Sequence, residues 1–186
     1  MLKNRLDKNA DRKKAVFLDR DGVIIVDKNF LWEIKQLEFI PRAVEALKAI
    51  PTDFLKIIIS NQSGIARGYF SAKQAEKFNT ALLAELKKKG VIIDGMYYCP
   101  HSPENNCECR KPKIGLFESA QRQFNIDYTR SWMIGDKSSD IQAGKNIGAA
   151  TIQVLTGYAG KEEGSLDVIA DQTVGDLYEA VETIKK

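Results

Sequence analysis

The chain has 186 residues, of which 44% are hydrophobic, and a formal net charge of +3 at pH 7. These values predict one globular domain over residues 1–186 that can form its core without disulfides. The small net charge argues against a dedicated nucleic-acid-binding protein, in which a basic stripe is expected. Neither a bilayer-spanning apolar run nor the apolar core of a signal peptide is found, which favours a cytoplasmic protein.

Residues 1–13 mix basic with acidic side chains and are expected to form a solvated polar tail. Short apolar runs then predict buried strands at 15–18, 55–59, 132–134 and 150–155, with 168–170 as a candidate fifth strand. Helical periodicity and capping residues predict helices at 41–50, 71–89, 116–124, 139–147 and 174–184. Alternating strands and helices predict an α/β fold in which helices cover both faces of a parallel sheet.

Polar residues follow three of these strands at the point where each strand ends. Asp19 and Asp21 follow the first strand, Ser60 and Asn61 the second, and Asp136 the third. Because ligands of open parallel sheets bind outside the carboxyl ends of the strands, these side chains are expected to share one site.

Two aspartates separated by one residue repel each other unless a cation lies between them. Carboxylate ligands suit Mg²⁺, which also binds the phosphate oxygens of substrates. Asp19-Arg20-Asp21-Gly22 alone also fits an ordinary turn with solvated carboxylates. The ordered appearance of Ser60, Lys111 and the segment 135–140 behind it argues against that interpretation.

Together these four segments resemble the four motifs of the haloacid dehalogenase superfamily of phosphotransferases. The resemblance extends from residue 15 to about residue 160. It implies a three-layer, Rossmann-like α/β fold. The connections between the predicted strands are too short to hold a large cap domain.

The resemblance also implies the chemistry. Asp19 is expected to attack phosphorus and form an aspartyl phosphate, and Asp21 to protonate the leaving alkoxide and then activate water. Mg²⁺ is expected to be held by Asp19, the backbone carbonyl of Asp21, and Asp136. Ser60 and Lys111 are expected to hold the phosphoryl oxygens.

Asp140, in the fourth motif, is expected either to support the water shell of the metal or to cap the helix that begins near residue 139.

All three cysteines and the only histidine lie within eleven residues, at Cys99, His101, Cys107 and Cys109. This set fits a structural, tetrahedral Zn²⁺ site without an open position. Pro100, Pro103 and the asparagines predict a loop without helix or strand over 99–109, ordered by the metal. Incidental thiols are the alternative, whereas a disulfide between Cys107 and Cys109 would be strained. The loop precedes Lys111 directly, so zinc is expected to shape the pocket indirectly.

The motif Cys-x-His…Cys-x-Cys-Arg-Lys-Pro resembles two groups within the superfamily. These are the 7-phosphatases of D-glycero-D-manno-heptose 1,7-bisphosphate, which act in bacterial heptose biosynthesis, and the histidinol-phosphate phosphatases. The segment 61–68 is more similar to the heptose group. A polynucleotide 3′-phosphatase and a non-catalytic zinc module remain as further alternatives. A monomer acting on a small sugar bisphosphate, without nucleic acid or membrane partners, is the default expectation.

Arg110 suits the second, non-reacting phosphate because its planar fork binds phosphate bidentately; otherwise it is an exposed side chain or pairs with Glu108. Compared with the heptose group, Ser60 replaces a common threonine and Asn29 replaces a common glycine. The resemblance implies a set of substrate-binding side chains: Arg20, Asp27, Phe30, Asn61, Gln62, Ser63, Arg110 and Lys137.

Overall fold

The computed structural model describes residues 12–186, in which one sheet of six parallel strands has the order β3-β2-β1-β4-β5-β6. The strands are β1 (Lys14–Leu18), β2 (Phe54–Asn61), β3 (Gly95–Cys99), β4 (Trp132–Gly135), β5 (Ala150–Val154) and β6 (Gln172–Val174). The expected parallel sheet is confirmed.

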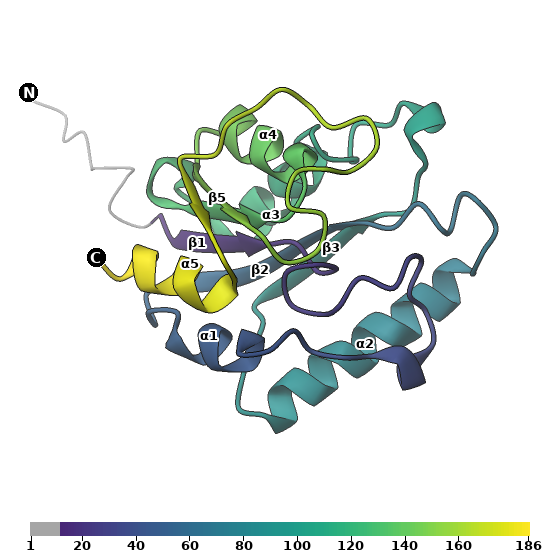
Figure 1. Cartoon of the computed structure of the whole chain (residues 1–186), viewed down its shortest axis with the longest axis horizontal. Coiled ribbons are helices and arrows are strands. Elements are labelled where there is room, and N and C mark those ends of the chain that lie inside the picture. The colour runs from purple at the N-terminus through teal and green to yellow at the C-terminus, as the bar shows by residue number, and fades with distance from the viewer. Residues whose placement is uncertain (1–11) are drawn as a thin grey trace, which may run out of the picture.

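Helices cover both faces of this sheet, so the expected three layers are present (Figure 1). One face carries α1 (Ala43–Ala49), α2 (Ala72–Lys88) and α5 (Leu177–Ile184), and the other carries α3 (Gly115–Phe124) and α4 (Ser138–Asn146). Short 3₁₀ helices lie at Ile34–Gln36, Pro103–Asn105 and Tyr128–Arg130.

Successive side chains of β1 point to opposite faces of the sheet and pack into two separate hydrophobic cores. Val16 and Leu18 pack in the core beneath α1, α2 and α5, whereas Phe17 packs in the core beneath α3. Residues 15–18 of this strand are therefore buried on both sides of the sheet. A buried central strand holds the residues that follow it in a fixed position.

Helix α2 begins and ends where the sequence predicts. Ser71 and Gln74 form a reciprocal capping box at its start, and the chain leaves the helix at Gly90 in a left-handed conformation with φ of 83°. Phe78 and Leu82 on its inner face are fully buried. This packing fixes α2 against the sheet close to the polar residues that follow β1.

Three predictions of local structure were wrong. Residues 168–170 form no strand; the edge strand β6 lies at Gln172–Val174, and α5 begins only at Leu177, capped by Asp176. Strand β3 was not predicted, and its last residue, Cys99, together with the 3₁₀ helix Pro103–Asn105, shows that segment 99–109 is not entirely irregular.

The polar tail expected over residues 1–13 lies mostly outside the described residues. Its last residue, Lys13, is paired instead with the main chain beside Ile126: the Lys13 N–H donates to Asn125 O and the Asp127 N–H donates to Lys13 O. Lys13 therefore extends the ordered start of β1.

The strand order reverses between β1 and β4, so these neighbouring strands flank the switch point where open α/β sheets bind ligands. Asp19 follows β1 and its N–H donates to Ile134 O of β4 at 3.0 Å. Among residues 12–186, no connection between strands folds into a large separate cap. In the same part of the chain, no helix has both the length and the apolar character needed to cross a membrane.

Candidate active site

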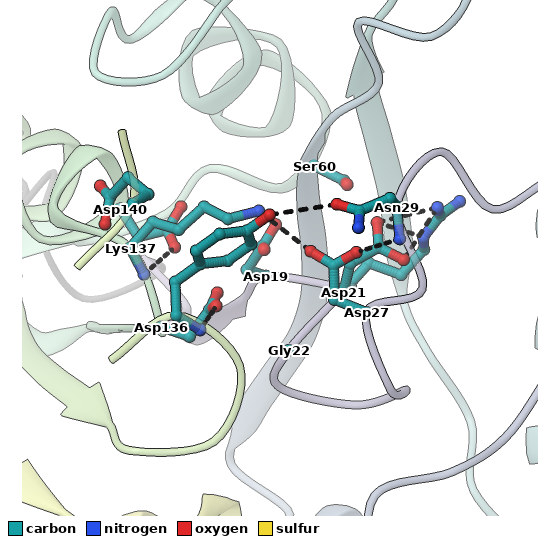
Figure 2. Close-up of polar contacts among 12 residues, drawn as sticks. Asp19, Asp21, Gly22, Asp27, Asn29, Ser60, Asp136, Lys137 and Asp140 are labelled. Carbon is teal, nitrogen blue, oxygen red and sulfur yellow. Dashed lines mark hydrogen bonds and ion pairs between the residues drawn. The ribbon is translucent and has the colours of Figure 1, made fainter. Parts of the chain in front are cut away.

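A pocket of about 650 Å³ opens at this switch point. Its walls come from the segments that follow β1, β2 and β5, from the segment around Arg110 and from the start of α4. In Figure 2, Asp136, Lys137 and Asp140 lie on one side of Asp19, and Asp21 lies on the other. The polar groups at the ends of separate strands therefore meet, as expected.

Lys111 lies buried between two carboxylates. Its Nζ is 2.7 Å from Asp19 Oδ1 and 2.7 Å from Asp140 Oδ1, and it donates to Ile59 O at 2.6 Å. Burial alone lowers the pKa of Lys111, but the charges of Asp140 and Asp19 outweigh burial and raise it. The side chain is thus held as an ammonium ion beside Asp19.

Asp140 also caps the start of α4, one of the two roles expected for it. Its Oδ2 accepts from the Lys137 N–H at 3.1 Å while Oδ1 pairs with Lys111. The pairing with Lys111, 29 positions away along the chain (140 − 111), was not foreseen from the sequence.

Asp19, Asp136 and Asp140 offer oxygen atoms that all lie within 4.8 Å of one another. Burial, and then the charges of Asp19 and Asp140, raise the pKa of Asp136 to about 8. Asp136 Oδ2 accepts from the Tyr158 N–H at 2.8 Å. Asp136 Oδ1 is buried and has no hydrogen-bond partner among residues 12–186.

This donor set fits a divalent cation. Buried carboxyl oxygens without partners are costly, and a hard cation is the partner they favour. The main chain packs closely against the same carboxylate at two glycines. A Cβ atom added to Gly22 would lie 2.5 Å from Asp136 Oδ2, and one added to Gly157 would lie 2.3 Å from it, so neither position has room for a side chain. Both oxygens of Asp140 are occupied, Oδ1 by Lys111 and Oδ2 by the Lys137 N–H, whereas Asp19 pairs with Lys111 through Oδ1 alone. Asp19 and Asp136 are therefore the carboxylates with an oxygen left to bind a metal.

The Asp21 carboxylate is held by the side chain of the preceding residue, Arg20. Arg20 is 1% exposed and its guanidinium donates to both oxygens of Asp21. It was expected to contact substrate, but it does not line the pocket. The structure therefore gives Arg20 a different position from the one expected.

Two residues at the end of β2 support the site rather than only lining it. Asn61 and the main chain of Lys111 exchange two hydrogen bonds, Lys111 N–H to Oδ1 at 3.0 Å and Nδ2 to Lys111 O at 3.2 Å. Gln62 Nε2 donates at 2.8 Å to both Ser60 Oγ and Asp21 Oδ2. Ser60 is 1% exposed and, unlike Asn61 and Gln62, is not among the residues that line the pocket.

The rim of the pocket joins the segment after β1 to the segment after β5. Lys137 Nζ lies 3.4 Å from Asp27 Oδ2 and 4.6 Å from the centre of the Tyr158 ring. The Tyr158 hydroxyl donates to Asn29 Oδ1 at 3.1 Å. Burial alone lowers the pKa of Lys137, but the charges of Asp19, Asp136 and Asp27 outweigh burial and raise it.

Tyr158 was not identified from the sequence, because a lone aromatic residue in a glycine-containing loop has no distinguishing pattern. Other side chains expected to bind substrate do line the pocket: Asp27, Phe30, Asn61, Gln62, Ser63, Arg110 and Lys137.

The four candidate zinc ligands converge beside the site. Cys109 Sγ lies 3.1 Å from Cys99 Sγ, 3.4 Å from Cys107 Sγ and 3.3 Å from His101 Nδ1. Cys99 Sγ lies 3.5 Å from Cys107 Sγ and 3.6 Å from His101 Nδ1. A tetrahedron with Zn–S bonds of about 2.3 Å has S–S edges of about 3.8 Å. The cluster therefore has nearly the dimensions of a Cys₃His zinc site.

The thiols differ in acidity. Burial raises the pKa of Cys99. Burial alone also raises the pKa of Cys107, but hydrogen bonds from Cys109 and Cys99 outweigh it and lower that pKa to about 6. A thiolate is the form of cysteine that binds metal. Next to the cluster, Arg110 donates to His101 O at 3.4 Å, while Glu108 pairs with Lys113.

A doubly wound parallel sheet with acidic residues gathered at its switch point is the arrangement expected of haloacid dehalogenase-like hydrolases. The family model described as HAD-hydrolase-like matches residues 108–180. The predicted resemblance to this superfamily and its fold is confirmed.

Similar proteins of known name place the chain more narrowly within this class of hydrolases. The chain is 41% identical to the D-glycero-β-D-manno-heptose-1,7-bisphosphate 7-phosphatase of Haemophilus ducreyi, with 91% of this chain and 97% of that protein covered. It is 38% identical to the corresponding α-heptose 7-phosphatase of Photorhabdus laumondii, covering 89% of this chain and 97% of that protein. The chain belongs to the family of these heptose-1,7-bisphosphate 7-phosphatases.

A solved structure agrees with this assignment. The crystal structure of D,D-heptose 1,7-bisphosphate phosphatase from B. bronchiseptica, complexed with magnesium and phosphate, matches this structure with a TM-score of 0.83. It is 28% identical to this chain, and the match covers 92% of this chain and 98% of that one.

Proposed function

We propose that this phosphatase hydrolyses the 7-phosphate of D-glycero-D-manno-heptose 1,7-bisphosphate in bacterial heptose biosynthesis. The observation that carries the proposal is the buried Asp19 carboxylate, 2.7 Å from Lys111 Nζ and beside Asp136, whose Oδ1 has no partner among residues 12–186. The identity of the sugar in the proposed substrate is taken from the names of the relatives. We also propose that the protein acts in the cytoplasm as a monomer on this small molecule.

The reaction proceeds in two displacements. In the first, a carboxylate oxygen of Asp19 bonds to phosphorus, the P–O bond to the sugar breaks, and Asp21 donates a proton to the departing oxygen. In the second, Asp21 takes a proton from a water molecule whose oxygen bonds to phosphorus. The bond to Asp19 then breaks and inorganic phosphate leaves.

Asp19 and Asp136, with the backbone carbonyl of Asp21, are the proposed Mg²⁺ ligands. When bound, Mg²⁺ neutralises charge on the phosphoryl oxygens. Lys111 and the Ser60 hydroxyl hold these oxygens in place, and Asp140 keeps the Lys111 ammonium directed at Asp19. The magnesium and phosphate bound to the B. bronchiseptica enzyme support this assignment.

Cys99, His101, Cys107 and Cys109 are proposed to bind structural Zn²⁺, since four ligands leave no position for a reacting water. The metal would fix the main chain just before Arg110, which lines the pocket.

The second phosphate of the substrate is proposed to bind Arg110, whose planar fork suits a phosphate group. Lys137 lines the same pocket and supplies a second positive charge. The sugar is proposed to contact the remaining wall residues: Asp27, Phe30, Asn61, Gln62 and Ser63.

The proposal is tested by phosphate release from heptose 1,7-bisphosphate, histidinol phosphate and fructose 1,6-bisphosphate, with Mg²⁺ and with a chelator. We expect preference for the heptose substrate, dependence on Mg²⁺, and turnover abolished in a folded Asp19→Asn variant because an amide cannot act as the nucleophile. Asp53→Asn, at an exposed carboxylate paired with Lys14, is the control. Preference for histidinol phosphate would overturn the substrate, and wild-type turnover by Asp19→Asn would overturn the mechanism.

A further inference from the structure

Arg20 is a fully buried arginine next to the proposed acid, and substrate binding does not account for it. It is 1% exposed and lies outside the pocket wall. Its Nε lies 3.1 Å from Asp21 Oδ2, and its Nη2 lies 3.0 Å from Oδ1 and 2.8 Å from Oδ2 of the same carboxylate. Burying a guanidinium ion is costly, so a role for this side chain is expected.

The guanidinium is itself held by groups from other elements. Its Nη1 donates to Asn79 Oδ1 of α2 at 2.7 Å, and its Nη2 donates to Gln62 Oε1 at 3.0 Å. Its Cζ lies 4.9 Å from the centre of the Phe78 ring of α2. All three nitrogen atoms of the guanidinium thus donate hydrogen bonds, and its orientation depends on the packing of α2 against the sheet.

The contacts of Asp21 come from this same network. Besides the arginine, Gln62 Nε2 donates to Asp21 Oδ2 at 2.8 Å, and the Asp21 side chain is 13% exposed. A planar fork that binds both carboxylate oxygens fixes the rotation of the carboxylate as well as its position. Lysine, a point charge on a flexible stem, does not fix that rotation.

We propose that Arg20 is a positioning residue that orients the Asp21 carboxylate for proton transfer and that Asn79 of α2 holds Arg20 for this purpose. The inference rests on the proposed function, in which Asp21 protonates the leaving group. Proton transfer needs a donor within hydrogen-bond reach of the departing oxygen, so a carboxyl group that is free to rotate transfers its proton poorly.

The nature of the leaving group separates this role from a merely structural one. A sugar alkoxide is strongly basic and needs a proton as it departs, whereas p-nitrophenolate leaves without one. A positioned general acid contributes about 10²–10⁴-fold to rate. The kcat/KM covers substrate binding and the steps up to formation of the aspartyl phosphate, so it includes this proton transfer and excludes the later hydrolysis of the intermediate.

The test compares kcat/KM for heptose 1,7-bisphosphate and for p-nitrophenyl phosphate. Arg20→Lys and Asn79→Leu are expected to lower the first by about 10- to 100-fold, within the range for general acid catalysis, and the second by less than about twofold. Asn79→Asp keeps an oxygen acceptor facing Arg20 and is expected to restore the wild-type ratio. Asn79 Nδ2 has no hydrogen-bond partner among residues 12–186, so this change removes no hydrogen bond there.

Arg42→Lys is the matched control, because Arg42 stacks on Tyr178 at the surface, away from Asp21. Asn79→Leu carries the test if Arg20→Lys does not fold, as judged by circular dichroism. Equal losses for the two substrates, or no loss for either, would overturn the role of Arg20.

Asp21→Asn separates failure of this inference from failure of the proposed function. If Asp21→Asn shows the selective loss and the Arg20 and Asn79 variants do not, only the inference fails. If Asp21→Asn itself shows no selective loss, Asp21 is not the acid, and the inference fails together with that part of the proposed function.

Discussion

At the scale of single residues, the site holds more negative charge than its nearest cation can balance. Lys111 is shared by Asp19 and Asp140, which leaves Asp136 without a cation in direct contact among residues 12–186. Burial and the two neighbouring aspartates then raise the pKa of Asp136 to about 8. In the absence of metal, the site therefore keeps a proton on Asp136 at neutral pH.

Mg²⁺ binding is accordingly expected to release protons. Because Asp136 binds a cation as a carboxylate, close to one proton should leave per Mg²⁺ at pH 7, with release vanishing well above pH 8. Affinity should rise by up to about tenfold per pH unit below pH 8 and then level off. Isothermal titration calorimetry in buffers of different ionisation enthalpy measures the proton count. Asp136→Asn is expected to lose both the binding and the release, whereas pH-independent Mg²⁺ affinity in the wild type would contradict the prediction.

Asp136 is expected to change the stability of the metal-free protein with pH in the opposite direction to most aspartates, whose pKa is lowered by folding. The raised pKa means that the folded, metal-free protein binds more protons than the unfolded chain between about pH 4 and pH 8. Asp136 therefore makes the metal-free protein less stable as pH rises through that window, and Mg²⁺ should reverse this loss.

At the scale of elements, two segments meet over the pocket. The Tyr158 hydroxyl, on the segment after β5, donates to Asn29 Oδ1, on the segment after β1, at 3.1 Å. Asn29 adopts a left-handed φ of 57°, which asparagine tolerates better than most residues. Asn29 thus adds a side-chain contact that the glycine expected here from the resemblance would lack.

Loss of this contact should weaken substrate binding more than chemistry. Tyr158→Phe keeps the ring over Lys137 and removes only the hydroxyl, and Asn29→Gly removes the acceptor. A net hydrogen bond of about 0.5–1.5 kcal/mol predicts a rise in KM of about 2- to 10-fold for either variant, with kcat little changed. The double variant should be no worse than either single variant; additive effects in steady-state kinetics would show that the two side chains act separately.

At the scale of the whole molecule, the cysteine and histidine cluster ties the edge of the sheet to the pocket. Cys99 ends the edge strand β3, and the chain returns from Cys109 directly to Arg110 and Lys111. A structural metal contributes its binding free energy to folding. Its removal should therefore loosen the pocket as well as destabilise the domain.

Purified protein is expected to contain one zinc per chain by elemental analysis, since the four ligands form one tetrahedral set. Its removal by a chelator should lower Tm, by about 2–4 °C for each kcal/mol lost, and reduce kcat/KM even with Mg²⁺ in excess. Cys107→Ser should behave in the same way, whereas Ser119→Ala on α3 should not. Protein prepared without added metal that contained no zinc, or a Tm unchanged by chelation, would contradict the zinc site.

The sheet and the position of the site could be predicted because buried parallel strands are short apolar runs that end abruptly in polar residues, as at Asp19 and Asp136. Strand β3 was not predicted because its inner residues Met96, Tyr97 and Tyr98 form only a short run with two polar hydroxyls, and they are only half-buried at the edge of the sheet.

Contacts between side chains that are far apart along the chain could not be predicted from the sequence. Lys111 and Asp140 are not neighbours on any one element, so no periodicity links them. Arg20 turns inward because the chain leaves β1 in a tight turn at Gly22, with φ of 83°, where the alternation of a strand no longer applies.

Cys99 belongs to two structures at once, and this constrains how the chain can diverge. It pairs in register with Asn61 as the last residue of β3, and its sulfur faces the other three members of the cluster. Asn61 in turn holds the main chain of Lys111. Related sequences that lack the cluster should therefore not lack one ligand alone. We expect all four ligand residues to be replaced together, accompanied by compensating changes at the position of Asn61.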